Sequence, residues 1–194
     1  NLTSRPLLSL TILLLFLPVP LRAARDQPGL CEAAAIEAAE TTGVPLNVLR
    51  AIALAESGRQ TQGEYRPWPW TVNFGGPGFW YSSSEEAQLA VEERQALGTT
   101  NFDVGCFQIN HRWHADGFET LADMFDPQQN ALYAARFLRR LHDETGSWPD
   151  AAAAYHSRTP ELAERYRSRF ESLRDGLDNG DSPLLAAVSR ENRF

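Results

Sequence analysis

The chain has 194 residues, of which 43% are hydrophobic and 22% charged, as expected for one globular domain with a proper core. Its formal net charge is −7 and no block of basic residues interrupts it, which argues against nucleic acid as a partner. All 18 basic residues are arginine, so the sequence excludes lysine nucleophiles, Schiff bases and the phosphate-binding lysine of a P-loop.

Residues 1–24 show the order of parts of a secretory signal peptide. Arg5 precedes an apolar run over residues 7–17, and a small-residue site follows around Ala23. We therefore expect this segment to be removed and the protein to be periplasmic or secreted. The alternative is an uncleaved N-terminal anchor, although the run is short for a membrane-spanning helix.

Cys31 and Cys106 are the two cysteines of the chain. Behind a secretory signal, such a pair indicates a disulfide more readily than a metal site. On the chain-entropy model, this bridge would stabilise the fold by about 4 kcal/mol. The alternative is a pair of unbonded cysteines that act as small hydrophobic residues.

A first helix is predicted from Cys31 to Thr42, and a second, apolar helix over residues 47–56 ends on one carboxylate, Glu56. The apolar residues of this second helix recur at i, i+4 and i+7 with others alongside, so the helix should be largely buried. Gly58 is expected to stop it, which leaves Glu56 in the last turn, where the helix dipole and burial both disfavour a charged carboxylate. Glu56 is thus a candidate general acid. The alternative is a solvated residue at a fraying helix end.

Residues 67–81 predict one small β-hairpin, because aromatic and β-branched runs flank a glycine-rich turn. The preceding segment, residues 59–66, is polar and is expected to be a loop, so the hairpin should be the only strand structure. Its aromatic side chains would either form a wall that stacks on sugars or pack the hairpin onto the helices. They are Trp68, Trp70, Trp80 and Tyr81.

Four further helices are indicated by capping residues, proline and glycine. They cover residues 84–97, 126–142, 148–155 and 159–173. The loop over residues 99–110 carries apolar residues that should hold it against the core. The prediction is a mainly α domain over residues 25–174, with six or seven helices and one small β-hairpin, followed by a flexible C-terminal tail over residues 175–194.

The sequence contains no P-loop, dinucleotide fingerprint or G-x-S-x-G motif. Its four histidines lack the spacing to carboxylates that metal sites show, so we expect no metal and no cofactor. Carboxylates, amides and aromatic residues remain, which are the residue types with which a site binds neutral sugars.

Three segments carry a family resemblance: Glu56-Ser57, Gly105-Cys106-Phe107-Gln108-Ile109-Asn110 and Ala154-Tyr155-His156-Ser157. In order and spacing they resemble the signature motifs of the soluble lytic transglycosylase family, whose catalytic domain is lysozyme-like. The resemblance covers roughly residues 34–170. The hairpin around Pro67-Trp68-Pro69-Trp70 resembles an insertion in one branch of the family. Motifs similar to residues 105–110 also occur in goose-type lysozymes and in muramidases of secretion machines.

The resemblance implies an α+β lysozyme-like fold and cleavage of the β-1,4 bond between N-acetylmuramic acid and N-acetylglucosamine in peptidoglycan. By the family pattern, Glu56 is the sole acid and base. It protonates the leaving glycosidic oxygen and then removes the proton of the muramyl 6-hydroxyl, which attacks its own anomeric carbon to give a 1,6-anhydro sugar. Such an acid must stay protonated near neutrality, and the reaction needs no second carboxylate as nucleophile.

The resemblance also implies the substrate contacts. Gln108 would bind the acetamido group of the substrate, and Tyr155 would orient Glu56 or the sugar. Ser57, beside the acid, suits a structural role better, and Gly105 allows close approach of the backbone. The full set of candidate substrate-binding residues is Ser57, Trp70, Asp103, Gln108, Asn110, Tyr155 and His156.

Two positions depart from the family pattern. His156 stands where the family usually has asparagine, and its protonation would add pH dependence near neutrality. Asp103 lies near the place where goose-type lysozymes are thought to have a water-activating carboxylate. An inverting hydrolase would need Asp103 within about 6.5–9.5 Å of Glu56. Otherwise Asp103 caps the loop.

The sequence leaves two alternatives to a lytic transglycosylase. One is a goose-type-like muramidase of the same fold, in which Asp103 positions water. The other is a catalytically weak peptidoglycan-binding module of a secretion or flagellar assembly, with the acidic tail from Asp175 as the docking segment. In each case we expect a monomer that binds peptidoglycan glycan strands.

Overall fold

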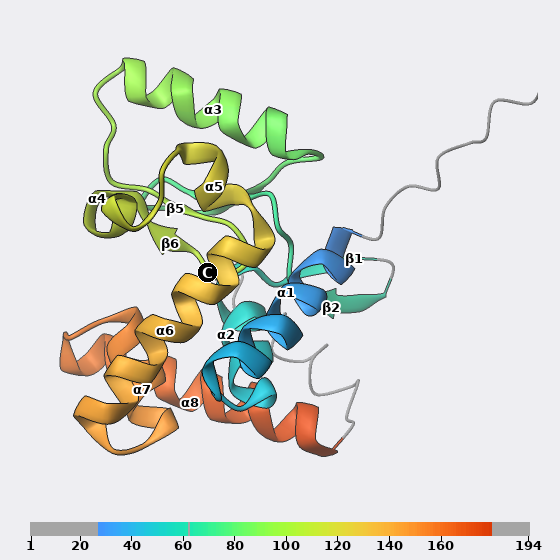
Figure 1. Ribbon diagram of the computed structural model, residues 1–194, viewed down its shortest axis with the longest axis vertical. Coiled ribbons are helices and arrows are strands. Elements are labelled where there is room, and N and C mark those ends of the chain that lie inside the picture. The colour runs from blue at the N-terminus through green and yellow to red at the C-terminus, as the bar shows by residue number, and fades with distance from the viewer. Residues whose placement is uncertain (1–26, 62, 180–194) are drawn as a thin grey trace, which may run out of the picture.

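The computed structural model describes residues 27–61 and 63–179, and helices make up most of this part (Figure 1). The helices are α1 (Gln27–Thr42), α2 (Leu46–Ser57), α3 (Ser84–Ala96), α4 (His111–His114), η1 (Ala115–Gly117), α5 (Leu121–Phe125), α6 (Pro127–Thr145), α7 (Trp148–His156) and α8 (Pro160–Asn179). The signal peptide expected in residues 1–24 lies outside the described residues. Within the described ranges, no helix has the length and apolar character needed to span a membrane.

Short strands form the β part of the described chain. They are β1 (Arg59–Thr61), β2 (Glu64–Arg66), β3 (Thr71–Asn73), β4 (Gly78–Trp80), β5 (Asp103–Val104) and β6 (Ile109–Asn110). β1 pairs with β2, and the other four form an antiparallel sheet in the order β4-β3-β5-β6. The mainly α class with a small β part is therefore confirmed, with eight α-helices in the described residues.

Two details of the predicted strand content are corrected. β3 and β4 form the predicted hairpin, but β1 and β2 occupy the segment expected to be a loop, and β5 and β6 extend the hairpin into a sheet. β1 and β2 lie in a polar segment, and β5 and β6 have two residues each, so these strands show no alternating apolar pattern. They exist because their backbone groups pair with a neighbouring strand.

The α2 helix lies at the centre of the core, as predicted. Leu49, Ala51 and Ile52 are fully buried, and α1 and α8 pack against this helix. The helix ends before Gly58, whose backbone is extended and not left-handed. Glycine is nevertheless needed there, because a Cβ atom would lie 2.5 Å from the ring of Tyr65.

The long helix α6 passes through the middle of the molecule, with α1 and α7 packed against it (Figure 1). Its predicted start is confirmed, since the Asp126 side chain accepts a hydrogen bond from the Gln129 N–H and Pro127 is the first helical residue. It ends at Gly146, which is left-handed with φ 84°. The short helices α4 and α5 lie in a segment for which the sequence predicted no element.

The last helix, α8, is longer than predicted. It continues to Asn179, beyond the end expected near residue 173, so residues 175–179 of the expected tail are helical. Gly176 is buried, and Asp178 accepts hydrogen bonds from the Asn47 amide of α2 at 3.0 and 3.1 Å. These contacts with α2 hold a polar segment in the helix. Residues 180–194 lie outside the described residues.

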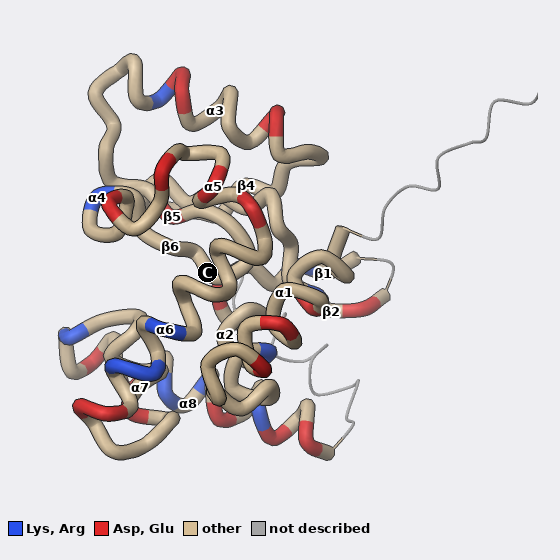
Figure 2. The backbone as a smooth tube through the Cα atoms, in the orientation of Figure 1, with Lys and Arg blue, Asp and Glu red and all other residues tan. Residues whose placement is uncertain are grey.

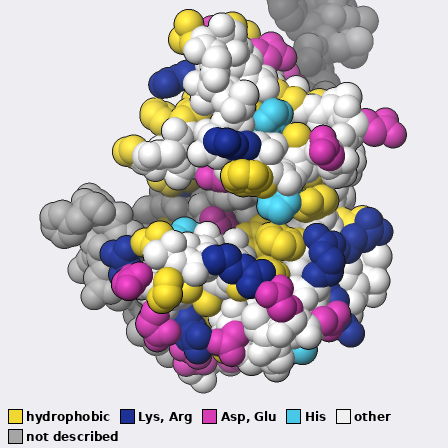
Figure 3. Space-filling view, turned by 90° about the vertical axis from the view of Figure 1, so that its left-hand side faces the viewer, with side chains coloured by type: hydrophobic (Ala, Val, Ile, Leu, Met, Phe, Trp, Pro, Cys, Tyr) yellow, Lys and Arg dark blue, Asp and Glu magenta, His cyan; other side chains and the backbone are white. Residues whose placement is uncertain are grey.

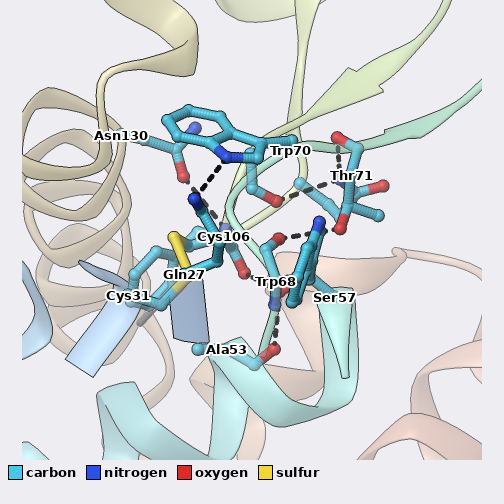
Figure 4. Close-up of a disulfide and its surroundings, with 12 residues drawn as sticks. Gln27, Cys31, Ala53, Ser57, Trp68, Trp70, Thr71, Cys106 and Asn130 are labelled. Carbon is cyan, nitrogen blue, oxygen red and sulfur yellow. Dashed lines mark hydrogen bonds between the residues drawn. A yellow bond between two sulfur atoms is a disulfide. The ribbon is translucent and has the colours of Figure 1, made fainter. Parts of the chain in front are cut away.

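A disulfide and a buried asparagine hold the loop between β5 and β6. Cys31 of α1 is bonded to Cys106 in this loop, with their Cα atoms 5.6 Å apart (Figure 4). Asn130 of α6 is fully buried; its Oδ1 accepts from the Phe107 N–H at 2.9 Å, and its Nδ2 donates to the Val104 carbonyl at 3.1 Å. Gly105 has φ +85°, and a Cβ there would lie 2.5 Å from Asn130. The loop is thus held from two sides, by the disulfide and by Asn130.

Candidate active site

Glu56 lies in the last turn of α2, with a side chain that is 14% exposed. Its Oε1 accepts a hydrogen bond of 2.6 Å from the hydroxyl of Tyr166 in α8. Burial raises the pKa of Glu56 to about 7, and the nearby Asp103 raises it too, while the Tyr166 hydrogen bond and the charge of Arg169 oppose this shift. A carboxyl group with this pKa is present in both protonation states near neutral pH.

A groove crosses the molecule, and Glu56 lies where its two halves meet. One half, the Asp103 half, has a volume of about 380 Å³ and is lined by Glu56, Asn73, Asp103, Gln108, Ile109, Asn110, Trp113, His114, Phe137, Tyr155 and His156. The other, the Arg59 half, has a volume of about 920 Å³ and is lined by Ala55, Glu56, Gly58, Arg59, Gln60, Tyr65, Thr71, Asn73, Gly76, Pro77, Gly78, Trp80, Gln108 and Arg169. Figure 3 shows this side of the molecule hollowed, with histidine and hydrophobic side chains along the hollow.

Gln108 lines both halves of the groove. Its backbone is left-handed, with φ 48°, which glutamine adopts only under constraint from its surroundings. Its Nε2 donates to the carbonyls of Thr71 and Gly105 at 3.0 and 3.1 Å. Because both partners are acceptors, the amide orientation is fixed and Oε1 remains the atom that accepts from a ligand.

Tyr155 lines the Asp103 half, but the hydrogen bond to Glu56 comes from Tyr166. The Tyr155 hydroxyl donates to the Phe107 carbonyl at 2.7 Å. Burial raises the pKa values of Tyr155 and Tyr166 well above that of a free phenol, so both hydroxyls remain donors at neutral pH. Tyr155 thus fixes the loop beside Glu56, and Tyr166 holds the carboxylate.

His156 lies next to the acid. Its Nδ1 is 4.0 Å from Glu56 Oε1, and its ring stacks on that of Tyr166 with centroids 4.5 Å apart. Burial lowers the pKa of His156, and the charges of Arg169 and Arg165 lower it further. The imidazole is therefore neutral at neutral pH.

Asp103 and Asn110 face each other across β5 and β6, and both line the Asp103 half. The Asn110 Nδ2 donates to the Asp103 carboxylate at 2.8 Å and to the Asn101 side chain at 3.0 Å. Burial raises the pKa of Asp103, and the Asn110 hydrogen bond opposes this. Asp103 thus ties the ends of the loop together and also lines the groove with Glu56.

Ser57 and Trp70 do not line the groove. Ser57 is fully buried; its hydroxyl lies 2.8 Å from the Cys106 carbonyl, to which it can donate, and accepts from the Trp68 N–H at 3.2 Å. Trp70 Nε1 donates to the side chain of Gln27 beside the disulfide (Figure 4). Both residues join elements of the fold, and neither is in the lining of either half of the groove.

Among the hairpin aromatics, Trp80 lines the groove. It is 42% exposed, and its Nε1 donates to the Ser57 carbonyl at 3.1 Å. Trp113 of α4 is 71% exposed and lines the Asp103 half. These two indole rings are the exposed stacking surfaces of the groove.

Sequence reasoning missed Tyr166, Asn73 and Arg169. Tyr166 carries a signal, because it shares the buried face of α8 with Phe170 and Leu173, at i, i+4 and i+7. A tyrosine on such a face needs a hydrogen-bond partner in the interior. Asn73 and Arg169 lie on elements whose pattern does not distinguish them from other polar residues.

Within the described ranges, no three His, Cys, Asp or Glu side chains come together as a metal site would require. His114 lines the groove, and its Nδ1 is 2.9 Å from the Tyr133 hydroxyl. That ring is part of an aromatic contact with Tyr133 and Phe137.

Comparison with protein families gives one match: residues 77–174 fit the model described as the transglycosylase SLT domain. Among curated proteins and solved structures, the chain has no significant match. The matched residues include Gln108, Tyr155 and Tyr166, which line the groove or hold its acid. Glu56 precedes the matched segment and is brought to it by the packing of α2 against α8.

Proposed function

Because the chain belongs to the transglycosylase SLT domain family, we propose that it cleaves the bond between N-acetylmuramic acid and N-acetylglucosamine with Glu56 as acid and base. Members of this family are lysozyme-like glycan lyases that act on peptidoglycan, in the periplasm or outside the cell. The observation that carries the proposal is the position of Glu56 where the two halves of the groove meet, with a pKa of about 7.

In the first step, protonated Glu56 donates its proton to the glycosidic oxygen, and the bond to the anomeric carbon breaks. Burial supports this step, because it keeps a large fraction of Glu56 protonated near neutral pH. The Tyr166 hydroxyl donates to Oε1 of Glu56, which leaves the other carboxyl oxygen to carry the proton. The Gln108 Oε1 accepts from the acetamido N–H of the sugar.

In the second step, the Glu56 carboxylate removes the proton of the muramyl 6-hydroxyl. The oxygen attacks the anomeric carbon of the same sugar, which forms a 1,6-anhydro ring and restores protonated Glu56. No water is consumed. The Tyr166 hydrogen bond supports the carboxylate in this step, since it stabilises the charged form.

Mass spectrometry of the muropeptides released from purified peptidoglycan tests this proposal. The wild-type protein should give 1,6-anhydro ends, and Glu56→Gln should give no cleavage while still folding and unfolding in a cooperative thermal transition. Glu40→Gln, which changes an exposed carboxylate on α1, is the matched control and should cleave normally. Cleavage by Glu56→Gln would contradict the assigned role.

One observation favours a second candidate, the goose-type-like muramidase. Asp103 lines the same half of the groove as Glu56 and acts on its pKa, so a water between the two carboxylates would have a base beside it. Asp103→Asn separates the candidates. If the protein is a transglycosylase, the Asp103→Asn variant should still form anhydro ends. If it is a muramidase, the wild type forms reducing ends and the variant should no longer form them. No turnover by the wild-type protein would favour the binding module instead.

A further inference from the structure

The two halves of the groove differ in charge. The Asp103 half contains the carboxyl groups of Asp103 and Glu56, with two histidines as its basic side chains. The Arg59 half contains the guanidinium groups of Arg59 and Arg169, and Glu56 is the carboxyl group in its lining. Because the whole chain has a net charge of −7, a cationic pocket is a local feature and not a property of the surface at large.

Arg59 follows the acid on the chain and is held by two indole rings. Its guanidinium carbon lies 4.7 Å from the centroid of the Trp68 ring and 5.8 Å from that of Trp80. A guanidinium stacked on aromatic faces keeps its N–H groups at its edge, where they can donate to a carboxylate in a two-pronged arrangement. The ring contacts also limit the side-chain freedom that binding would otherwise remove.

Arg169 reaches the same half from α8, one turn after Tyr166. Its Nη2 donates to the Tyr65 hydroxyl at 3.1 Å. Its Nε is buried and has no hydrogen-bond partner among the described residues. The charge of Arg169 acts on Glu56, the one carboxyl group among the described residues that line the Arg59 half. While Glu56 is protonated, an anion bound in the Arg59 half would be the negative charge facing this guanidinium.

The chemistry of the substrate supplies such an anion. The glycan of peptidoglycan is neutral except at muramic acid, which carries a lactyl group and, on it, a stem peptide with carboxylates. The Arg59 half, at about 920 Å³, also has more than twice the volume of the Asp103 half, at about 380 Å³. It therefore has room for a substituent in addition to the sugar.

We propose that the Arg59 half of the groove binds a carboxylate of the stem peptide on a muramic acid residue, with Arg59 and Arg169 as the binding residues. The inference rests on the proposed function, because it takes peptidoglycan as the substrate. It adds that the protein selects strands that still carry their peptides. In Figure 2, arginines of the described residues lie along α6 and α8, and Arg169 is one of those on α8.

Isothermal titration calorimetry with the Glu56→Gln protein, which keeps the ligand intact, measures the binding directly. Three ligands of equal sugar number distinguish the source of the carboxylate. They are glycan strands with stem peptides, strands freed of peptides so that the lactyl carboxylates are exposed, and neutral chito-oligosaccharides. We expect the peptide-bearing strands to bind most tightly, with an affinity that falls as the salt concentration rises.

Arginine variants of the Glu56→Gln protein test which residues bind the stem-peptide carboxylate. Arg59→Gln and Arg169→Gln should each weaken binding of peptide-bearing strands about tenfold, and should change binding of chito-oligosaccharides much less. Arg158→Gln is the matched control, because Arg158 is exposed, pairs with Glu144 and lines neither half of the groove. It should bind all three ligands as the parent does.

The outcomes separate this inference from the proposed function. The stem-peptide site would be overturned if all three ligands bound with equal affinity. It would also be overturned if the arginine variants lost the same amount of affinity for each ligand. Tightest binding of peptide-free strands would also overturn it, since the lactyl carboxylate would then be the anion. The proposed function is tested separately, by cleavage with the wild-type protein. The calorimetry does not depend on that result.

Discussion

At the scale of single residues, burial raises the pKa of Glu56, whereas Tyr166 and Arg169 lower it. The hydroxyl of Tyr166 donates to the carboxylate and favours its charged form, and the charge of Arg169 does the same. Desolvation is the larger effect, so the pKa still rises to about 7. The acid strength of Glu56 is therefore a balance that single substitutions can move either way.

Tyr166→Phe tests one side of this balance. Removing the hydroxyl takes away a hydrogen bond to the charged form, so the pKa of Glu56 should rise above about 7. The fall in activity at high pH should then occur at a higher pH than in the wild type. Peak activity should fall about tenfold, because the carboxyl group also loses its orientation. The pH profile of peptidoglycan cleavage measures both effects, and a shift to lower pH would contradict this account.

Glu56 also makes the stability of the fold depend on pH. A carboxyl group whose pKa is 4.5 when exposed and about 7 when folded keeps its proton in the folded state over this range. The folded protein then binds more protons than the unfolded protein, so the free energy of unfolding falls as pH rises from about 4.5 to about 7.

Glu56→Gln should remove this dependence and be the more stable protein above pH 7, by up to about 3 kcal/mol. Urea denaturation at several pH values, with wild type and variant side by side, gives the difference. Other titrating groups cancel in this comparison because they are present in both proteins. Identical pH dependence in the two proteins would show that Glu56 is solvated in the fold.

At the scale of elements, the loop between β5 and β6 depends on a helix that comes later in the chain. Asn130 of α6 bonds to the backbone of Val104, Met124 and Phe107. These bonds place the loop so that Gln108 reaches both halves of the groove. The position of the loop that carries Gln108 is thus determined by a side chain of the core.

Asn130→Ala should destabilise the protein by about 3 kcal/mol, since it leaves three buried backbone groups without partners. Thermal and urea denaturation measure the loss. Gln128→Ala, at an exposed position of the same helix, is the control and should change stability by less than about 0.5 kcal/mol. A cost as small as that of the control would mean that water replaces the amide.

The sequence predicts the elements whose pattern is long enough to repeat. The apolar run of α2, the caps of α3 and α6 and the hairpin of β3 and β4 were all predicted close to their observed bounds. The strands β1 and β2 were not predicted because their segment is polar, and β5 and β6 were not predicted because each has two residues. The end of α8 was missed because its last turns are polar and are held by contacts with α2.

In the candidate site too, local motifs predict some residues, whereas others are brought to the site only by the packing of distant elements. Glu56, Gln108, Tyr155, His156, Asp103 and Asn110 were proposed from motifs and all line the groove. A motif does not say which of its members support the fold. Ser57 lies in such a motif but is fully buried. Tyr166 contacts Glu56 across 110 positions of sequence, and only the packing of α8 against α2 brings them together.

At the scale of the whole molecule, the disulfide joins the first described helix to the middle of the chain. Cys31 and Cys106 are 75 positions apart, so their bond restricts a long loop of the unfolded chain. The double variant Cys31→Ser, Cys106→Ser should lose about 4 kcal/mol of stability on the chain-entropy model. Thermal denaturation with and without dithiothreitol measures this. Dithiothreitol should lower the melting temperature of the wild type and leave that of the variant unchanged.

The same bond has a consequence for where the covalent structure of the groove wall forms. Cys106 lies two residues before Gln108, so the covalent link enters the wall of the groove itself. A newly made chain has free thiols, and disulfides form in the periplasm or outside the cell and not in the cytosol, so we expect the loop that carries Gln108 to gain this link only in such a compartment. Under the proposed function, the wall of the groove would then receive its covalent link in the compartment that contains peptidoglycan.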